Sequence, residues 1–275
     1  MKNFKSVKYV MILSVLIGFS ILNAQDPAEI IRNSHDALKI SSFEAVSTLT
    51  IHDGKGNQRI RQSSMASMSF PDGTEKRIIK FLGPAEVKGT GILIFDYPER
   101  KDDMWIYLPA LRKTRRIVSS EKSKGFMGSE FSNADMTAPG LNDFSYKLLG
   151  EGIKNGEDCW KIESTPISID LEDEYGYSKS VSWISKNDYI VHETEYYDFD
   201  GKKIKTIKTR SYKLLEKDPD KYMVTSMVAE NHENGRMSEM VMDRAEQIPT
   251  KTEYFTVTSV SYTHLRAHET VLELV

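Results

Sequence analysis

Apolar and polar residues alternate with a period of two along most of the chain from Phe43 onward. This alternation is typical of β-strands, and turn signals built from Gly, Pro, Asn and Asp separate the alternating runs at short intervals. Such short connections favour antiparallel strands over the longer crossovers of parallel strands. The predicted strands span residues 44–53, 58–70, 74–83, 90–97, 103–108, 112–119, 144–150, 158–164, 179–185, 190–199, 202–214, 222–229 and 236–248.

This number of strands is larger than one flat sheet holds, because twisted open sheets rarely exceed ~10 strands without curling. We therefore expect a mainly β fold whose sheet curls into a barrel or half-barrel. Alternate strand positions carry Ile, Leu, Met, Phe, Tyr or Trp on one face and Lys, Arg, Glu or Thr on the other. In a closed small barrel the apolar side chains fill the core, whereas a wider or incomplete barrel covered by helices encloses a cavity for an acyl chain or a similar ligand.

A helix is predicted before the first strand. Asp26 is a capping residue, Pro27 stands at the first helical position, and Glu29 follows three residues after the cap. One apolar stripe then recurs at helical spacing, formed by Ile30, Ile31, Ser34, Ala37 and Leu38. We expect this helix, residues 27–40, to cover an apolar surface.

The amino terminus has the pattern of a secretory signal peptide. Three lysines precede an apolar run over residues 9–22, and small residues follow it. The run is shorter than the ~20 residues that a membrane-spanning helix needs. We predict a signal peptide over residues 1–24, cleavage after Ala24, and a mature chain exported from the cytoplasm.

Residues 25–260 are predicted to form one domain, because roughly 250 residues suit a single sizeable β domain. Residues 261–275 break the strand pattern, and we interpret them as a non-native tail. Cys159 is the only cysteine, so it can form no internal disulfide, and no cysteine stands at the cleavage point to carry a lipid anchor.

The charge balance and the motifs exclude several classes of function. A net charge of −3 gives no support for nucleic acid as a partner. No motif indicates a cofactor or a metal site, and no nucleophile lies on a recognisable elbow, so we expect no enzyme. Glu193 and Glu195 share one strand face and support a less favoured hydrolase hypothesis. An outer-membrane barrel is disfavoured because the outward positions carry many charges.

A basic cluster adjoins an apolar, glycine-containing run within residues 108–136. The cluster consists of Arg112, Lys113, Arg115 and Arg116. Adjacent cations repel, so we expect partners for them. One interpretation is pairing with the nearby acids Glu99, Asp102 and Asp103, and the other is recognition of an anionic lipid headgroup or an acidic partner.

The segment from Phe81 to Met136 resembles the outer membrane lipoprotein-sorting branch of the lipoprotein-carrier superfamily, whose members are LolA- and LolB-like. The resemblance rests on "P…KGTG" (Pro84 to Thr90), "WIYLPALRKTRRI" (Trp105 to Ile117) and "FMGSEFSNADM" (Phe126 to Met136). Weaker similarity covers nearly all of the mature chain. The sequence departs from the branch at Asn133 and Ala134, where an aromatic residue and an acid usually stand.

The resemblance implies a strongly curved antiparallel sheet forming an incomplete barrel around an apolar cavity. The amino-terminal helix and a central helical or loop segment would act as a lid, in which Gly125 and Gly128 would allow movement. As lipid-contacting residues we predict Trp105, Tyr107, Phe126, Met127, Phe131 and Met136. The alternative is that the phenylalanines and methionines of the central segment are ordinary core residues under a fixed loop.

The function that the resemblance implies is that of a periplasmic carrier or chaperone in a Gram-negative bacterium. It would shield a lipoprotein acyl chain or another lipid during transfer, with transient membrane contact. An inner-membrane exporter of the resistance-nodulation-division type is a partner that the family suggests. The alternative is a periplasmic sensor or adaptor subunit that uses the same scaffold without transporting lipid.

Overall fold

The computed structural model describes residues 25–262, and the predicted signal peptide and most of the predicted tail lie outside the described residues. The described chain forms one antiparallel sheet of thirteen strands, ordered β6-β5-β4-β3-β2-β1-β13-β12-β11-β10-β9-β8-β7. The strands are β1 (Ser42–His52), β2 (Gln58–Ser69), β3 (Glu75–Gly83), β4 (Gly91–Asp96), β5 (Asp103–Leu108), β6 (Lys113–Ile117), β7 (Phe144–Lys154), β8 (Glu157–Pro166), β9 (Lys179–Ser185), β10 (Val191–Tyr197), β11 (Lys203–Glu216), β12 (Lys221–Asn231) and β13 (Met237–Glu246). Each strand corresponds to one predicted from the alternation.

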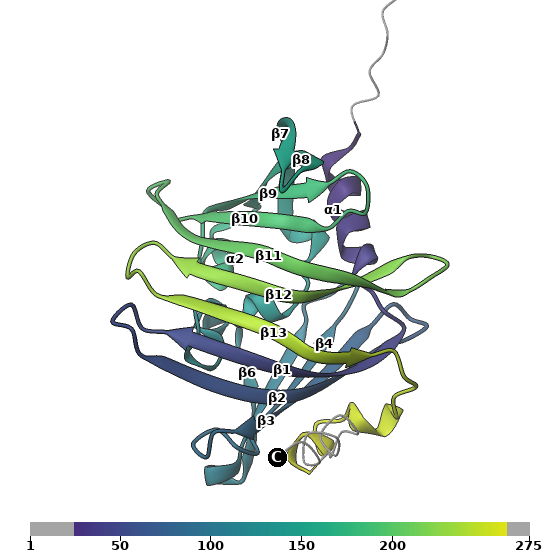
Figure 1. Ribbon diagram of the computed structural model, residues 1–275, viewed down its shortest axis with the longest axis vertical. Helices are drawn as coiled ribbons and strands as arrows, with labels where there is room; N and C mark the ends of the chain where they lie inside the picture. The colour runs from purple at the N-terminus through teal and green to yellow at the C-terminus, as the bar shows by residue number, and fades with distance from the viewer. Residues whose placement is uncertain (1–24, 263–275) are drawn as a thin grey trace, which may run out of the picture.

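The sheet is strongly curved and open. Strands β4 and β6 pass behind β1 and β13, so the sheet wraps around a concave face (Figure 1). Strands β6 and β7 are the two ends of the order and do not pair with each other. The predicted mainly β, incomplete barrel is therefore confirmed.

Helix α1 (Pro27–Ala37) begins where the capping residues predicted. Asp26 Oδ1 accepts a hydrogen bond from the backbone N–H of Ala28 at 3.0 Å. The buried side of the helix packs with Trp160, Ile162 and Ile184 of β8 and β9. The helix ends at Ala37 and not at the predicted residue 40, because the chain must turn into β1, and Ile40 joins the core on the concave face.

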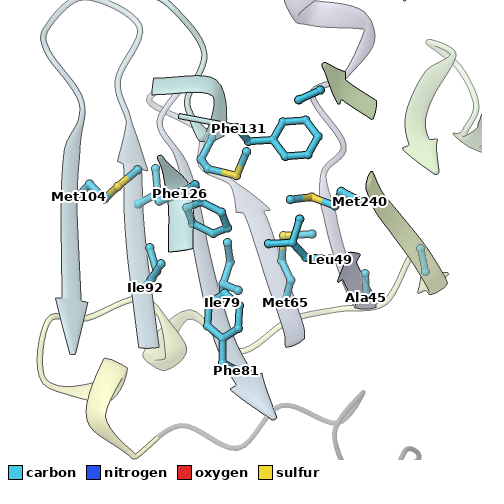
Figure 2. Close-up of a cluster of buried hydrophobic side chains, with 14 of the residues drawn as sticks. Ala45, Leu49, Met65, Ile79, Phe81, Ile92, Met104, Phe126, Phe131 and Met240 are labelled. Atoms are coloured by element: carbon cyan, nitrogen blue, oxygen red, sulfur yellow. The ribbon is translucent and has the colours of Figure 1, made fainter. Parts of the chain in front are cut away.

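The two faces of the sheet bury different apolar clusters. The concave cluster contains alternate residues of β1 to β5 and β13, together with Phe126 and Phe131 from outside the sheet (Figure 2). The convex cluster is formed by the other alternate residues of β2 to β5, covered by Phe255 and Val260 near the carboxyl end. Phe255 and Val260 are therefore part of this packing, and the boundary of the predicted tail stays a prediction.

Residues 118–143, which join β6 to β7, form the crossing segment. It contains short 3₁₀ turns at Ser119–Glu121, Phe126–Gly128, Ala134–Met136 and Leu141–Asp143. Phe126 and Phe131 are 2% and 0% exposed, so the segment is anchored in the concave core at two points. The central covering element expected from the resemblance is present, in the form of turns.

Helix α2 (Ile169–Tyr175) is a short helix in an acidic stretch for which the sequence predicted no helix. Ser168 caps it, and Glu174 is buried. The Oε2 atom of Glu174 lies 2.6 Å from Lys101 Nζ and its Oε1 atom 3.0 Å from Lys122 Nζ. These ion pairs fix α2 against the start of the crossing segment. Neither described helix is long and apolar enough to span a membrane.

Candidate functional site

A cavity of about 700 Å³ lies on the concave face of the sheet. Its walls come from β1, β2, β3, β12 and β13, from α1, and from the crossing segment. This volume falls in the range of roughly 300–1,000 Å³ that is usual for small-molecule sites. The apolar interior predicted from the alternation is therefore not completely filled by side chains.

The interior of the cavity is apolar and rich in methionine. Phe43, Leu49, Ile79, Phe81 and Phe126 line it. Six methionines contribute to the same wall: Met65, Met136, Met223, Met227, Met240 and Met242. Methionine is unbranched and polarizable, so it adapts to irregular apolar shapes better than branched side chains do. Such a wall suits hydrocarbon of variable shape.

Strand β3 carries the change from apolar to polar. Its cavity-facing residues, taken from the interior toward the rim, are Phe81, Ile79, Arg77 and Glu75. The neighbouring strand β4 places Asp96 directly opposite Glu75 in the register. One end of the cavity is therefore charged, and it lies beside an apolar interior.

The charged end contains one partly satisfied network. Arg77 forms an ion pair with Glu75 and donates from Nη1 to the backbone oxygen of Met136 at 2.9 Å. The Oδ1 atom of Asp96 is buried and has no hydrogen-bond partner among the described residues. Burial raises the pKa of Asp96 to about 7, although the nearby Arg77 acts in the opposite direction.

Helix α1 closes one side of the cavity. Arg32, His35, Asp36 and Lys39 line it from the helix and the turn that follows. Burial lowers the pKa of His35 to about 4, so its ring is neutral at physiological pH. The backbone oxygen of Asp36 accepts from Lys221 Nζ at 2.7 Å, which ties the end of the helix to β12.

Of the six predicted lipid-contacting residues, Phe126 and Met136 line the cavity. Their role in binding stays a prediction. Phe126 packs near Phe81, with ring centroids 6.2 Å apart, and Figure 2 shows it above the side chains of β3. Met127 packs against the same core but does not line the cavity, and neither does Phe131.

Trp105 and Tyr107 lie on the other side of the sheet. Both pack in the convex cluster, and Trp105 contacts Phe95 with ring centroids 5.0 Å apart. The sequence predicted that Trp105 and Tyr107 lie in strand β5. The alternation shows that they share one face of the strand, but it does not show whether that face is the concave one. Met104 and Ile106, which alternate with them in β5, pack in or against the concave cluster. The placement of Trp105 and Tyr107 gives no support to direct contact with a ligand in the cavity.

The basic cluster lies at the β6 edge of the sheet and does not line the cavity. Arg116 pairs with Asp103, and Arg115 Nη1 lies 2.7 Å from Glu121 Oε2. Only Arg116 therefore pairs with one of the predicted acids, because the partner of Arg115 is Glu121. Arg112 and Lys113 are exposed, and no ion pair joins either to another described residue in the structure.

Of the other predicted acids, Asp102 pairs with the buried Lys122, which had not been predicted as its partner. Glu99 lines the cavity mouth and is exposed. The sequence separation between Asp102 and Lys122 spans two strands, so local spacing gave no signal for this pair.

The glycines of the crossing segment are required by its geometry. A Cβ atom on Gly125 would lie 2.6 Å from the backbone oxygen of Ser129, and Gly128 has a φ of +76°. Both belong to a tight turn closed by the backbone hydrogen bond from Phe126 N to Phe131 O. The turn accounts for both glycines, whereas the predicted movement of the segment stays a prediction.

The two positions that depart from the family pattern have structural roles here. Asn133 Nδ2 donates to the backbone oxygen of Glu121 at 2.8 Å, which holds the crossing segment to its own start. Ala134 is buried in a cluster with Phe144, with Leu171 and Tyr175 of α2, and with Tyr177. A small residue fits that packing.

The hydrolase hypothesis gains no support from the geometry. Glu193 pairs with Lys154 at 2.6 Å, and Glu195 pairs with Lys203 at 2.9 Å. Each carboxylate has its own cation, and the pair does not line the cavity. Among the described residues, no group of three or more His, Cys, Asp or Glu side chains is placed to hold a metal ion.

Sequence reasoning missed the charged end of the cavity. Glu75, Arg77 and Asp96 are typical charged strand residues in sequence, and alternation assigned such residues to solvent. The sequence could have shown it, because Glu75, Arg77, Ile79 and Phe81 are spaced two residues apart on one strand, and such residues face the same side of the sheet.

Comparison with known proteins gives a consistent fold. A family model described only as that of an uncharacterized protein matches residues 73–261. A domain from Vibrio parahaemolyticus described as an outer membrane lipoprotein-sorting protein is 25% identical, with a TM-score of 0.77 over 86% of this chain and 98% of that one. A DUF1329 family protein from Desulfovibrio piger is 27% identical, with a TM-score of 0.77 over 86% of this chain and 100% of that one.

A LolA superfamily protein from Nitrosomonas europaea shares the fold. It is 17% identical, with a TM-score of 0.64 over 85% of this chain and 98% of that one. No curated protein matches the sequence significantly. The resemblance inferred from residues 81–136 is thereby confirmed, and the similarity extends over most of the chain.

Proposed function

Because the chain belongs to the LolA-like family of outer membrane lipoprotein-sorting proteins, we propose that it is a carrier that shelters the hydrocarbon part of a lipid or lipoprotein in its concave cavity. The observation that carries the proposal is the cavity of about 700 Å³, which is lined by six methionines and by aromatic residues. An unfilled apolar cavity of this size loses packing contacts, so a purely structural role does not explain it.

The energetics suit reversible binding. Burial of apolar surface contributes about 0.8 kcal/mol per CH₂, so ten methylenes supply about 8 kcal/mol before the costs of association. Those costs reduce the net affinity to a range from which release is feasible. No covalent step is needed for this activity, and the function we propose is non-enzymatic.

The location and the partners follow from the same proposal. A lipoprotein-sorting role places the mature chain in the periplasm, where it would meet the membrane transiently. An inner-membrane exporter of the resistance-nodulation-division type is the donor that the family suggests. The exposed Arg112 and Lys113 at the β6 edge are available for an acidic partner or an anionic headgroup.

Binding of a fluorescent fatty-acyl probe tests the proposal. Ala138 lines the cavity from an exposed part of the crossing segment, so Ala138→Trp adds bulk there with little disturbance of the core. We expect the wild-type protein to bind the probe and Ala138→Trp to bind it at least about ten-fold more weakly. Ala110→Trp is the matched control, because Ala110 is exposed and lies away from the cavity. Equal binding by all three proteins would contradict the proposal.

A further inference from the structure

The charges that line the cavity do not balance. The carboxylates are Asp36, Glu75, Asp96, Glu99 and Asp135, and the cations are Arg32, Lys39 and Arg77. Asp135 is neutralised by Lys205 of β11, whose Nζ lies 2.6 Å from Asp135 Oδ2. One carboxylate more than the available cations therefore remains in the wall.

The excess is concentrated around Asp96. Glu75 lies directly opposite Asp96 on β3, and Glu75 and Asp102 are the carboxylates that raise the pKa of Asp96. Arg77 and Lys122 are the cations that lower it. Three carboxylates thus share two cations. Like charges directly opposite each other in a sheet are unfavourable, so this arrangement needs a compensating group.

The two cations are already engaged elsewhere. Arg77 pairs with Glu75 and donates to the backbone oxygen of Met136. Lys122 pairs with both Asp102 and Glu174. Neither cation forms an ion pair with Asp96, whose Oδ1 atom is sealed from solvent without a hydrogen-bond partner among the described residues.

A buried carboxylate oxygen without a donor costs free energy, and structures normally satisfy such atoms. Asp96 lines the cavity at its charged end, directly opposite Glu75. A ligand that extends its hydrocarbon along the methionines would bring its polar group to this end. Because Glu75 and Asp102 are like charges beside Asp96, a hydrogen-bond donor without negative charge would complement it there.

We propose that the cavity selects amphiphiles whose polar group is a hydrogen-bond donor, cationic or neutral, that pairs with Asp96, and that it discriminates against anionic headgroups. This inference rests on the proposed carrier function and narrows its ligand class. An ammonium group makes a charge-assisted hydrogen bond to the carboxylate, and the hydroxyls of a glyceryl group make weaker ones. A fatty acid carboxylate or a phosphate monoester would meet Glu75 and Asp96 as like charges.

The test uses three single-chain probes with the same twelve-carbon chain: dodecylamine, monolauroylglycerol and lauric acid. Each displaces a fluorescent apolar probe from the wild-type protein at pH 8, below its micelle-forming concentration. We expect the amine to bind about ten-fold or more tightly than the acid, with the glycerol ester between them, because hydrogen bonds to charged groups are among the strong ones.

Two variants locate the effect. Asp96→Asn keeps the shape of the side chain and removes its charge, so it should lower the preference for amine over acid by about ten-fold. Asp200→Asn is the matched control, because Asp200 is an exposed acid that does not line the cavity, and it should keep the wild-type preference.

The outcomes separate the two proposals. If all three probes bind equally well to the wild-type protein, or if Asp96→Asn keeps the wild-type preference, the headgroup inference is wrong and the carrier function stands. If no probe displaces the fluorophore from the wild-type protein, the carrier function itself fails, and the headgroup inference fails with it.

Discussion

Arg77 of β3 donates from Nη1 to the backbone oxygen of Met136 at 2.9 Å, and this bond ties the crossing segment to the rim of the cavity. The same guanidinium pairs with Glu75. One side chain therefore both neutralises an acid in the cavity wall and holds the segment that covers the cavity. A change at Arg77 should therefore affect both the stability of the fold and the position of the segment that covers the cavity.

Replacing Arg77 with methionine should destabilise the protein. The change leaves Glu75 without its cation beside Asp96, and breaking a buried pair in this way costs about 3–5 kcal/mol. Amide hydrogen exchange over residues 134–142 should also become faster, because the bond to Met136 is lost. Urea unfolding and hydrogen exchange measure the two effects.

A double variant distinguishes charge from packing in this prediction. Arg77→Met combined with Glu75→Gln removes both charges, so most of the lost unfolding free energy should return. A double variant as unstable as the single variant would show that the ion pair is not the cause.

Asp96 should make stability depend on pH in a defined direction. Its pKa is raised from 3.8 to about 7, so the folded state holds this proton more tightly than the unfolded state does. The stability that protonated Asp96 contributes is fully present below pH 3.8 and is lost as pH rises through about 7.

Replacing Asp96 with asparagine should therefore raise the unfolding free energy at pH 8 by about 1–4 kcal/mol, and the gain should shrink toward pH 4. Urea unfolding of the wild-type protein and of Asp96→Asn at several pH values checks this. A gain of equal size at both ends of the pH range would argue against a raised pKa.

Replacing Phe126 with alanine should lower stability as well as ligand binding. Phe126 is 2% exposed and packs in the concave core, and truncating a buried phenylalanine costs about 3–5 kcal/mol. Phe199→Ala is the comparison, because Phe199 is 60% exposed and should change stability by less than about 0.5 kcal/mol. Similar unfolding midpoints for the two variants would contradict the anchoring role of Phe126.

Much of the fold could be predicted from the sequence, because each β-strand carries its own local signal. The alternation located every strand of the sheet, and Asp26 with Pro27 located the start of α1. Helix α2 was missed because seven residues give too short a periodic pattern, and acids such as Glu174 suggest a solvated loop when their cations are far away in sequence.

The candidate site was harder to predict, because it depends on the direction in which each side chain points after the sheet curls. Of the predicted lipid-contacting residues, Phe126 and Met136 line the cavity, whereas Trp105 and Tyr107 belong to the convex face. The methionines of β12 and β13 were not singled out, since only the register brings Met227 opposite Met240. Long-range pairing of this kind has no local signal.

Lys122 and Lys113 should respond differently to the same substitution. Lys122 is buried between Asp102 and Glu174, so Lys122→Met leaves two buried carboxylates short of a cation and should cost about 3–5 kcal/mol. Lys113 is exposed at the β6 edge, and Lys113→Met should leave the unfolding free energy within about 0.5 kcal/mol of the wild-type value. Thermal or urea unfolding of the two variants gives the comparison, and equal losses would show that Lys122 is not fixed as the structure places it.

The most direct test of the carrier function is the content of the cavity after expression. The mature protein would be purified from the periplasm of a lipid-producing host, extracted with organic solvent, and analysed by mass spectrometry beside Ala138→Trp. We predict that a single-chain or acylated lipid accompanies the wild-type protein in near-stoichiometric amount and is depleted in the variant. Equal, trace amounts of lipid in both extracts would contradict the account.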